Sequence, residues 1–140
     1  MKILYLSSEA RPFIASGGLA DVAGSLPIAL NALGHDCRVV LPLYGDIKEE
    51  WREKMKFLCN FNVTLAWRNQ YCGLYSYELN DVTYYFIDNQ YYFSRGNLYG
   101  NFDDGERFAF FCRAALEILP DIDFFPDILH AHDWHAALSV

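Results

Sequence analysis

The opening of the chain alternates a short apolar run, a glycine-containing loop, a helical pattern and a second apolar run. Lys2–Leu6 and Cys37–Leu41 are the two runs, and their apolar character indicates strands buried on both faces of a sheet. Leu19–Leu33 carries apolar residues at helical spacing, and Gly34 after it is typical of a left-handed helix cap. Pro27 predicts a kink or a split inside that helix. The order predicts a right-handed βαβ unit and a mainly parallel α/β sheet.

The middle of the chain has a different pattern. Phe57–Trp67, Tyr71–Leu79 and Val82–Ile87 are rich in aromatic and β-branched residues with mixed alternation. Asn69-Gln70 and Asn80-Asp81 lie between them and are typical of turns. We therefore expect antiparallel strands or hairpins inserted in the parallel core.

The last part of the chain returns to a helix and a strand. Asp103–Leu119 has helical periodicity, and Ile128–His132 is another short apolar run. Ala136–Val140 begins a further helix, and a domain rarely ends within the first turns of a helix. The sequence thus predicts one truncated Rossmann-like domain over residues 1–140, with helices on both faces of its sheet and an inserted antiparallel β region.

Composition and charge argue against several classes of protein. Hydrophobic residues make up 53% and aromatic residues 17% of the chain, which favours a packed core. The net charge of −7 argues against nucleic-acid and membrane-surface binding, since both need a basic patch. No apolar run is long enough to cross a bilayer, and the polar residues after Leu6 do not fit a signal peptide, so we expect a cytoplasmic protein. Four cysteines without a CxxC pair are expected to be reduced thiols: Cys37, Cys59, Cys72 and Cys112.

The first candidate site is the loop with Ser16, Gly17 and Gly18. Paired glycines between a strand and a helix let the backbone approach a ligand, and the helix N-terminus favours an anion such as a phosphate. The third glycine of the dinucleotide fingerprint is missing. The glycines also fit a simple turn of the chain. Asp21, early in the helix, fits either a ligand contact or compensation of the helix dipole.

The second candidate site follows the last predicted strand. Ligands of open α/β sheets bind beyond the carboxyl ends of the strands, where Asp133 lies. Alternation places His130 and His132 on one strand face, with one of them buried. Neighbouring strand residues diverge, which argues against a metal site. Asp133 is also expected to cap the next helix.

The third candidate is the aromatic segment Tyr91–Gly100. Its tyrosines, together with glycine, asparagine and arginine, fit either a surface that stacks sugars or bases, or a well-packed loop. Asp104, Glu106 and Arg107 open the helix that follows. The acidic residues complement the helix dipole there.

These motifs occur in one order from Met1 to Val140. Ser-Ser-Glu and Pro-Phe are followed by Gly-Gly-Leu-Ala-Asp-Val, Leu-Gly-His-Asp and Val-x-Leu-Pro-x-Tyr. Then come Tyr-Phe-x-Arg-x-x-Leu-Tyr-Gly, Glu-Arg-Phe-x-x-Phe and Pro-Asp-x-x-His-x-His-Asp-Trp-His. The whole chain resembles the bacterial glycogen synthases and plant starch synthases.

The resemblance implies a retaining glucosyltransferase with two Rossmann-like domains facing a cleft, the GT-B arrangement. This chain would be the N-terminal, acceptor-side domain, without the C-terminal nucleotide-binding domain. The enzyme would transfer glucose from ADP-glucose to the non-reducing end of an α-1,4-glucan, glycogen or a maltooligosaccharide, with no metal and no cofactor.

The resemblance also implies roles for individual residues. Asp21 and Asp133 would be the catalytic residues: Asp21 would orient donor or acceptor in the cleft, and Asp133 would lie near the reacting sugar. The substrate-binding residues would be Glu9, Ala15, Ser16, Gly17, Gly18, Tyr99 and His132.

Position 15 departs from the family. The family has lysine there, and Ala15 removes a cation that would contact the diphosphate. Donor binding is then weaker, or a group such as Arg11 replaces the lysine, or the activity is lost. A non-catalytic α-glucan-binding module is therefore the alternative. A nucleotide-binding oxidoreductase is disfavoured, because the third glycine and an acidic residue at the tip of Val39–Leu41 are missing.

Overall fold

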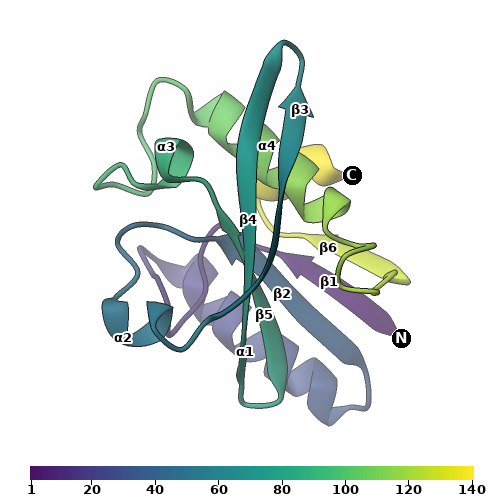
Figure 1. The fold of residues 1–140 in the computed structure, drawn as a ribbon. Helices are drawn as coiled ribbons and strands as arrows, with labels where there is room; N and C mark the ends of the chain where they lie inside the picture. Colours follow the sequence, from purple (N-terminus) through teal and green to yellow (C-terminus); the bar gives the residue numbers. More distant parts are fainter.

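The protein, described over residues 1–140 by a computed structural model, is built on one six-stranded sheet with the order β3-β4-β5-β2-β1-β6 (Figure 1). The strands are β1 (Lys2–Leu6), β2 (Asp36–Pro42), β3 (Lys56–Leu65), β4 (Arg68–Leu79), β5 (Val82–Asp88) and β6 (Ile128–Ala131). The helices are α1 (Gly18–Ala32), α2 (Glu49–Arg52), α3 (Gln90–Phe93), α4 (Asp104–Glu117) and the 3-10 helix η1 (Trp134–Ser139).

Four neighbouring strands, β5, β2, β1 and β6, form a parallel core. β1, α1 and β2 make the predicted βαβ unit. The connections β1–α1–β2 and β5–α4–β6 run in opposite directions along the sheet, so right-handed crossovers place α1 and α4 on opposite faces. Figure 1 shows α1 behind the sheet. The predicted α/β fold with helices on both faces is confirmed.

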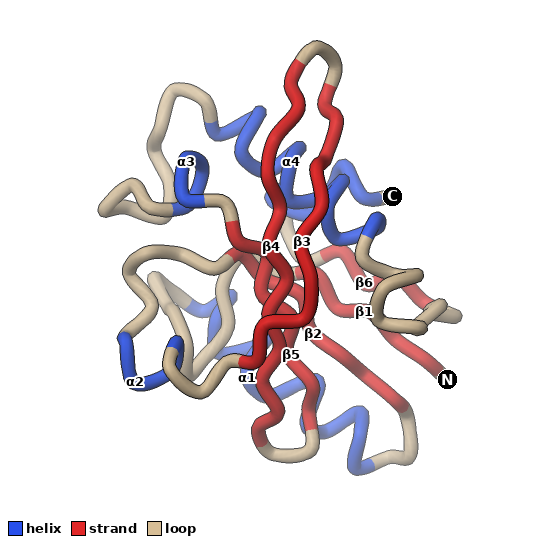
Figure 2. The backbone as a smooth tube through the Cα atoms, in the orientation of Figure 1, coloured by secondary structure: helices blue, strands red, loops and turns tan.

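The antiparallel region lies at one edge of the sheet and is not inserted into it. β3 and β4 form a long ribbon that extends beyond the other strands (Figure 2). β5 pairs antiparallel with β4 but parallel with β2, so it belongs to the parallel core as well. The predicted antiparallel pairing of β3, β4 and β5 is confirmed, and β5 has a parallel neighbour in addition.

One of the two predicted turns is present. Asn80 and Asp81 have φ angles of 52° and 62°, which match the left-handed turns that join two-residue hairpins. The other turn lies at Ala66 and Trp67, and Asn69 pairs with Thr64 inside the ribbon. The predicted turn at Asn69-Gln70 was wrong, because polar residues are compatible with a strand that is exposed to solvent.

Helix α1 continues past Pro27, so the predicted split of this helix was wrong. Pro27 lies inside the helix and is buried, although its ring removes one backbone hydrogen bond. The helix ends as predicted at Gly34, which has a φ of 90°. The amides of Gly34 and His35 donate to the carbonyls of Asn31 and Leu30, a Schellman motif.

The core is a single cluster of 33 buried residues that involves both faces of the sheet. Helix α4 contributes the residues that its periodicity predicted, among them Phe108, Phe111 and Ala115. All four cysteines are free, and only Cys59 is not buried. No helix combines the length and the apolar character that crossing a bilayer requires.

Candidate functional site

A pocket of ≈ 320 Å³ lies at the carboxyl ends of β1 and β6, where the loops that follow these strands meet. This is the position at which open α/β sheets bind ligands, and the volume suits a small ligand. The lining residues come from three distant parts of the chain: Glu9, Ser16, Gly17, Gly18, Leu19, Tyr99, Asp133, Trp134 and His135. The pocket thus brings together most of the residues that the sequence singled out.

The glycine loop forms one wall of the pocket. Gly17 precedes the first residue of α1, and no side chain caps this helix. Neither Gly17 nor Gly18 has a positive φ, and a Cβ added to either would meet no atom within 4 Å. The turn of the chain therefore does not need glycine here. The geometry therefore favours a ligand-binding role for the two glycines over a simple turn, because small residues allow a ligand to approach the helix N-terminus.

Glu9 ties the glycine loop to the rest of the pocket. Its side chain is buried, and its carboxylate accepts hydrogen bonds from Ser16 Oγ at 2.6 Å, from the amide of Gly17 at 3.2 Å and from the Tyr99 hydroxyl at 2.8 Å. A further hydrogen bond of 2.7 Å joins Tyr99 to Ser8 Oγ. Because these contacts engage both oxygens of Glu9, the residue holds the walls of the pocket in position.

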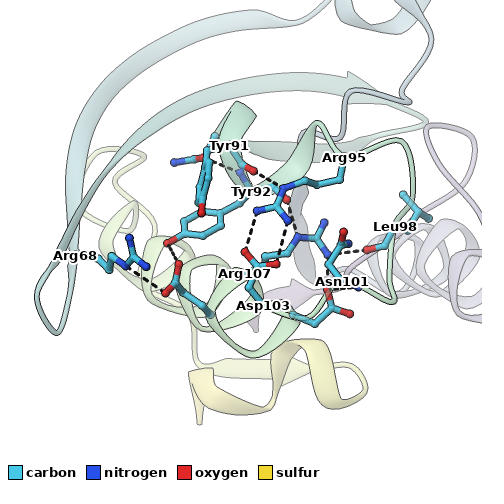
Figure 3. Close-up of polar contacts among 11 residues, drawn as sticks. Arg68, Tyr91, Tyr92, Arg95, Leu98, Asn101, Asp103 and Arg107 are labelled. Atoms are coloured by element: carbon cyan, nitrogen blue, oxygen red, sulfur yellow. Dashed lines mark hydrogen bonds and ion pairs between the residues drawn. The ribbon is translucent and has the colours of Figure 1, made fainter.

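The loop that carries Tyr99 is held by a buried arginine (Figure 3). Arg107 is completely buried; its Nε donates to the Tyr92 carbonyl at 2.6 Å and its Nη1 donates to the Leu98 carbonyl at 3.0 Å. Nη1 also lies 2.8 Å from Asp104 Oδ1. Burial opposes ionisation of Asp104, but hydrogen bonds from Arg107 and from the loop amides lower its pKa. The loop before α4 is therefore fixed by charge-assisted hydrogen bonds.

Two more ion pairs strengthen this region. Arg95 and Asp103 form a bidentate ion pair, in which Nη1 donates to Oδ1 at 3.0 Å and Nη2 donates to Oδ2 at 2.8 Å. These hydrogen bonds from Arg95 lower the pKa of Asp103. Glu106 accepts from the Tyr92 hydroxyl at 2.7 Å and lies 3.3 Å from Arg68 of β4 (Figure 3). The ribbon, α3 and α4 are thus connected behind the loop of Tyr99.

Asp133 lies at the mouth of the pocket in an unusual backbone conformation. Its φ of 68° and ψ of 179° belong to a region that residues other than glycine rarely adopt. Its carboxylate accepts from the amide of Trp134 at 2.7 Å, which confirms the predicted cap of the next helix. That helix begins at Trp134 and is a 3-10 helix. Backbone strain of this kind concentrates at functional sites.

Sequence reasoning did not identify His135 and Trp134 as site residues. His135 is 5% exposed, its ring lies 4.5 Å from that of Tyr99, and its Nδ1 has no hydrogen-bond partner. Burial lowers the pKa of His135, although Asp133 and Glu9 oppose this shift. His135 therefore lines the pocket with a ring whose neutral form is favoured by burial, and its Nδ1 is buried without a partner. The only signal in the sequence was the position of His135 directly after the His-Asp-Trp motif.

Three predicted site residues lie outside the lining of the pocket. Asp21 is exposed and forms an ion pair with Arg11 on the surface of α1. Ala15 is exposed at the edge of the glycine loop. His132 is half-buried, and its Nδ1 contacts the Tyr5 hydroxyl. The guanidinium of Arg11 is engaged with Asp21.

The two histidines of β6 share one face of the strand, as predicted. The rings of His130 and His132 lie 5.7 Å apart, and Tyr5 stacks on His130 at 4.4 Å. Neither histidine is fully buried, because β6 is the last strand of the sheet, so the predicted burial of one of them was wrong. No three histidine, cysteine, aspartate or glutamate side chains are arranged to hold a metal ion.

Comparisons with known proteins agree on one family. The family described as the starch synthase catalytic domain matches residues 2–140. The glycogen synthase of Geobacillus thermodenitrificans is 56% identical over 138 residues, and that of Bacillus subtilis is 55% identical over the same length. Each match covers 99% of this chain and 28% of the relative, so the chain spans less than a third of the length of these curated relatives.

A solved structure has the same fold. The catalytic domain of starch synthase IV from Arabidopsis thaliana, bound to ADP and acarbose, superposes with a TM-score of 0.88 and 30% sequence identity. The match covers 98% of this chain and 29% of the plant protein. Together with the family match over almost every residue, these similarities show that the chain belongs to the starch synthase catalytic domain family.

Proposed function

We propose that this chain is the N-terminal, acceptor-side domain of a cytoplasmic GT-B glucosyltransferase. The enzyme transfers glucose from ADP-glucose to the non-reducing end of an α-1,4-glucan and retains the anomeric configuration. The observation that carries this proposal is the pocket in which the glycine loop, Tyr99 and Asp133 meet. The names of the relatives, glycogen synthases and a starch synthase bound to ADP and acarbose, support the choice of substrates.

The glycine loop would contact the donor. The first amides of an uncapped helix have no partner within the helix, and the helix dipole favours negative charge beside them. Gly17 and Gly18 leave space for a phosphate or the transferred glucose to approach these amides. Ser16 Oγ lies in the same wall, where its hydrogen bond to Glu9 orients it.

Asp133 would act on the sugar. Breaking the bond to the diphosphate develops positive charge at the anomeric carbon, and a carboxylate beside it stabilises that charge. Tyr99 and Trp134 supply aromatic surfaces for the sugar, and His135 lines the pocket beside them. A glycosidase-like pair of carboxylates is not evident, because the other carboxylate of the pocket, Glu9, is engaged by hydrogen bonds inside the protein.

The roles of Asp21, Ala15 and His132 in this proposal are indirect. Asp21 would orient donor or acceptor from the side of the cleft, through its ion pair with Arg11. Ala15 occupies the place of the family lysine at the rim of the loop. His132 would fix β6 through Tyr5, and so the start of the segment that carries Asp133.

Glucose transfer by the full-length protein, measured with ADP-glucose and a maltooligosaccharide, tests the proposal. We expect transfer by the wild type and a loss of at least about a hundredfold in Asp133→Asn, because a charge beside the reacting carbon is removed. Asp121→Asn, an exposed aspartate after α4, is the matched control and should be unaffected. Equal activity of the Asp133 variant and the wild type would contradict the role of Asp133.

The alternative is an α-glucan-binding module without catalysis. It is favoured by one observation, the alanine at position 15. Isothermal titration of the full-length protein separates the two functions. A transferase binds both ADP-glucose and maltooligosaccharide, whereas a binding module takes up only the maltooligosaccharide and transfers nothing.

A further inference from the structure

The loop between α3 and α4 carries Tyr99 into the candidate pocket without regular secondary structure. None of the backbone groups of residues 95–100 takes part in a hydrogen bond with another backbone group. A loop of this kind opens easily unless other contacts hold it, and an aromatic ring on it would then not keep one position. The position of Tyr99 therefore depends on hydrogen bonds that side chains make with the loop.

Two charged side chains of α4 bind the backbone on both sides of Tyr99. Before it, Nη1 of Arg107 donates to the Leu98 carbonyl at 3.0 Å (Figure 3). After it, the Asp104 carboxylate accepts from the amides of the next two residues, at 2.9 and 3.2 Å. Nη1 of Arg107 and Oδ1 of Asp104 lie 2.8 Å apart, so the two side chains act as one unit. We call this ion pair the Tyr99 clamp.

The clamp is itself held rigidly. Arg107 is completely buried and the Asp104 side chain is 18% exposed, so water competes little for their hydrogen bonds. Nε of Arg107 donates to the Tyr92 carbonyl at 2.6 Å, which fixes the guanidinium. The guanidinium also lies 5.3 Å from the centre of the Phe108 ring, which lies 5.9 Å from the ring of Tyr99.

The ion pair next to the clamp has a different role. Asp103 forms its bidentate pair with Arg95 and bonds neither of the amides that follow Tyr99. Asp104 engages both of its oxygens with these amides and with Arg107. Two neighbouring aspartates at the start of α4 therefore separate the general attachment of the loop from the position of Tyr99.

The side chain of Tyr99 reaches from the clamp into the pocket. Its hydroxyl donates to Glu9 at 2.8 Å and lies 2.7 Å from Ser8 Oγ, and its ring lies 4.5 Å from the ring of His135. If the loop shifted, the ring would move with it and the contact with Glu9 would lengthen. Such shifts matter for a reaction, since a misplacement of about 1 Å can lower a rate about a hundredfold.

We propose that Arg107 and Asp104 are positioning residues, which hold Tyr99 where it contacts the sugar. The inference rests on the proposed function, in which Tyr99 supplies an aromatic surface for the sugar. Neither Arg107 nor Asp104 lines the pocket, so their effect on the reaction has to pass through the loop of Tyr99. A purely structural ion pair would instead change stability without any dependence on Tyr99.

The test uses the full-length protein and the substitution Asp104→Asn. Asparagine has nearly the size of aspartate, but it loses the charge and replaces one acceptor oxygen by a donor. Asp103→Asn is the matched control, since it makes the same change one residue earlier and weakens the pair with Arg95 instead. Arg107→Lys, which keeps the charge and loses the fork of donors, is a second variant of the clamp. Each substitution is made in the wild type and in Tyr99→Ala.

We measure kcat and KM for ADP-glucose and for maltoheptaose, together with urea unfolding of each variant. We expect both clamp variants to lower kcat/KM about tenfold when Tyr99 is present and less than about twofold in Tyr99→Ala, because the residue that they position is then missing. Asp103→Asn should change kcat/KM by less than about twofold in either background. An equal loss in both backgrounds, or an unchanged kcat/KM in Asp104→Asn, would overturn the proposal.

Hydrogen exchange of the Gly100 and Asn101 amides separates this proposal from the proposed function, because it needs no substrate. Exchange at least about tenfold faster in Asp104→Asn than in the wild type and in Asp103→Asn supports the clamp. If the amides open in this way while even the wild type transfers no glucose, the proposed function fails and the clamp still holds Tyr99. If the wild type transfers glucose and the amides exchange equally in all three proteins, the clamp fails and the transferase stands.

Discussion

At the scale of single residues, the strained backbone of Asp133 lowers the stability of the fold, while its carboxylate is needed for the proposed activity. A non-glycine residue in this conformation costs about 1–3 kcal/mol, and replacing a helix cap by glycine costs only a few tenths of a kcal/mol. We therefore expect Asp133→Gly to stabilise the fold by about 1 kcal/mol in urea unfolding. The same change should abolish glucose transfer, because it removes the carboxylate.

Asp133→Ala is the comparison for this prediction. Alanine also lacks the carboxylate but keeps the strain, so this variant should be inactive without any gain in stability. A glycine variant no more stable than the alanine variant would show that the strain is absent.

The alanine at position 15 allows a gain-of-function test. None of the residues that line the candidate pocket is lysine or arginine, so a donor diphosphate bound as we propose would meet no cation among them. Ala15 is exposed at the rim of the loop, where a lysine would not disturb packing. We expect Ala15→Lys to tighten ADP-glucose binding about tenfold, through a charge-assisted contact.

Isothermal titration at two salt concentrations checks this prediction. An added ion pair weakens as salt is raised, so the gain in affinity should shrink at high salt. Ala15→Gln, with similar length and no charge, should bind like the wild type. If the glutamine variant gains as much as the lysine variant, charge is not the cause.

At the scale of elements, Glu9 connects β1, the glycine loop and the loop of Tyr99. Glu9→Ala would remove the acceptor of Ser16 Oγ and of the Gly17 amide, and would leave the Tyr99 hydroxyl with Ser8 Oγ as its remaining partner. Ser16 and Gly17 are exposed, so water can replace the lost acceptor, and a typical hydrogen bond contributes about 0.5–1.5 kcal/mol; we expect a loss of about 1 kcal/mol in the free energy of unfolding. The glycine loop should also become more open to proteolysis.

Two further substitutions serve as controls for Glu9→Ala. Glu9→Gln keeps one acceptor oxygen and should lose only part of the stability. Glu50→Ala removes an exposed glutamate in the first turn of α2 and should change the free energy of unfolding by less than about 0.5 kcal/mol. A loss for Glu50→Ala as large as for Glu9→Ala would contradict the role of Glu9.

The elements also show what the sequence can predict. Continuous apolar runs identified β1 and β2, because strands buried on both faces need apolar residues throughout. Asn80-Asp81 identified a hairpin, because both residues tolerate a positive φ. The parallel pairing of β5 with β2 could not be predicted, since the buried residues of β5 fit a parallel and an antiparallel neighbour equally well.

The sequence predicted individual residues of the candidate site, but not the contacts that bring them together. Single motifs pointed to the glycine loop and to Asp133. The hydrogen bond of Tyr99 to Glu9 joins residues 90 positions apart, and no local spacing encodes that contact. His135 was missed because its burial depends on packing against Tyr99 and Phe108, which belong to another part of the chain.

At the scale of the whole molecule, titration of buried groups predicts sensitivity to acid. Burial lowers the pKa of His130 and of His135 in the folded state. Between the folded pKa and the unfolded value of about 6.5, the unfolded chain binds more protons, so stability rises with pH there. Lowering the pH from 7 to 5 should therefore reduce the free energy of unfolding.

Asp103 and Asp104 extend this sensitivity to lower pH. Their pKa values are lowered in the folded state. Their contribution to the free energy of unfolding is therefore fully present above about pH 4 and is lost as the pH falls further. Urea unfolding at pH 7, 6 and 5 measures the histidine contribution. His130→Gln should flatten the change between pH 7 and 5, and an unchanged slope in this variant would exclude His130 as a cause.

The last prediction concerns residues 1–140 on their own. The candidate pocket offers helix amides, aromatic rings and one carboxylate at its mouth, but no cation for the leaving diphosphate. Curated relatives are more than three times as long, so further segments of such an enzyme can supply that charge. We expect residues 1–140 to bind maltooligosaccharides and to transfer no glucose from ADP-glucose, whereas the full-length protein transfers it. A radiolabelled-donor assay on both proteins decides the point, because measurable turnover by residues 1–140 would mean that the amides alone stabilise the leaving group.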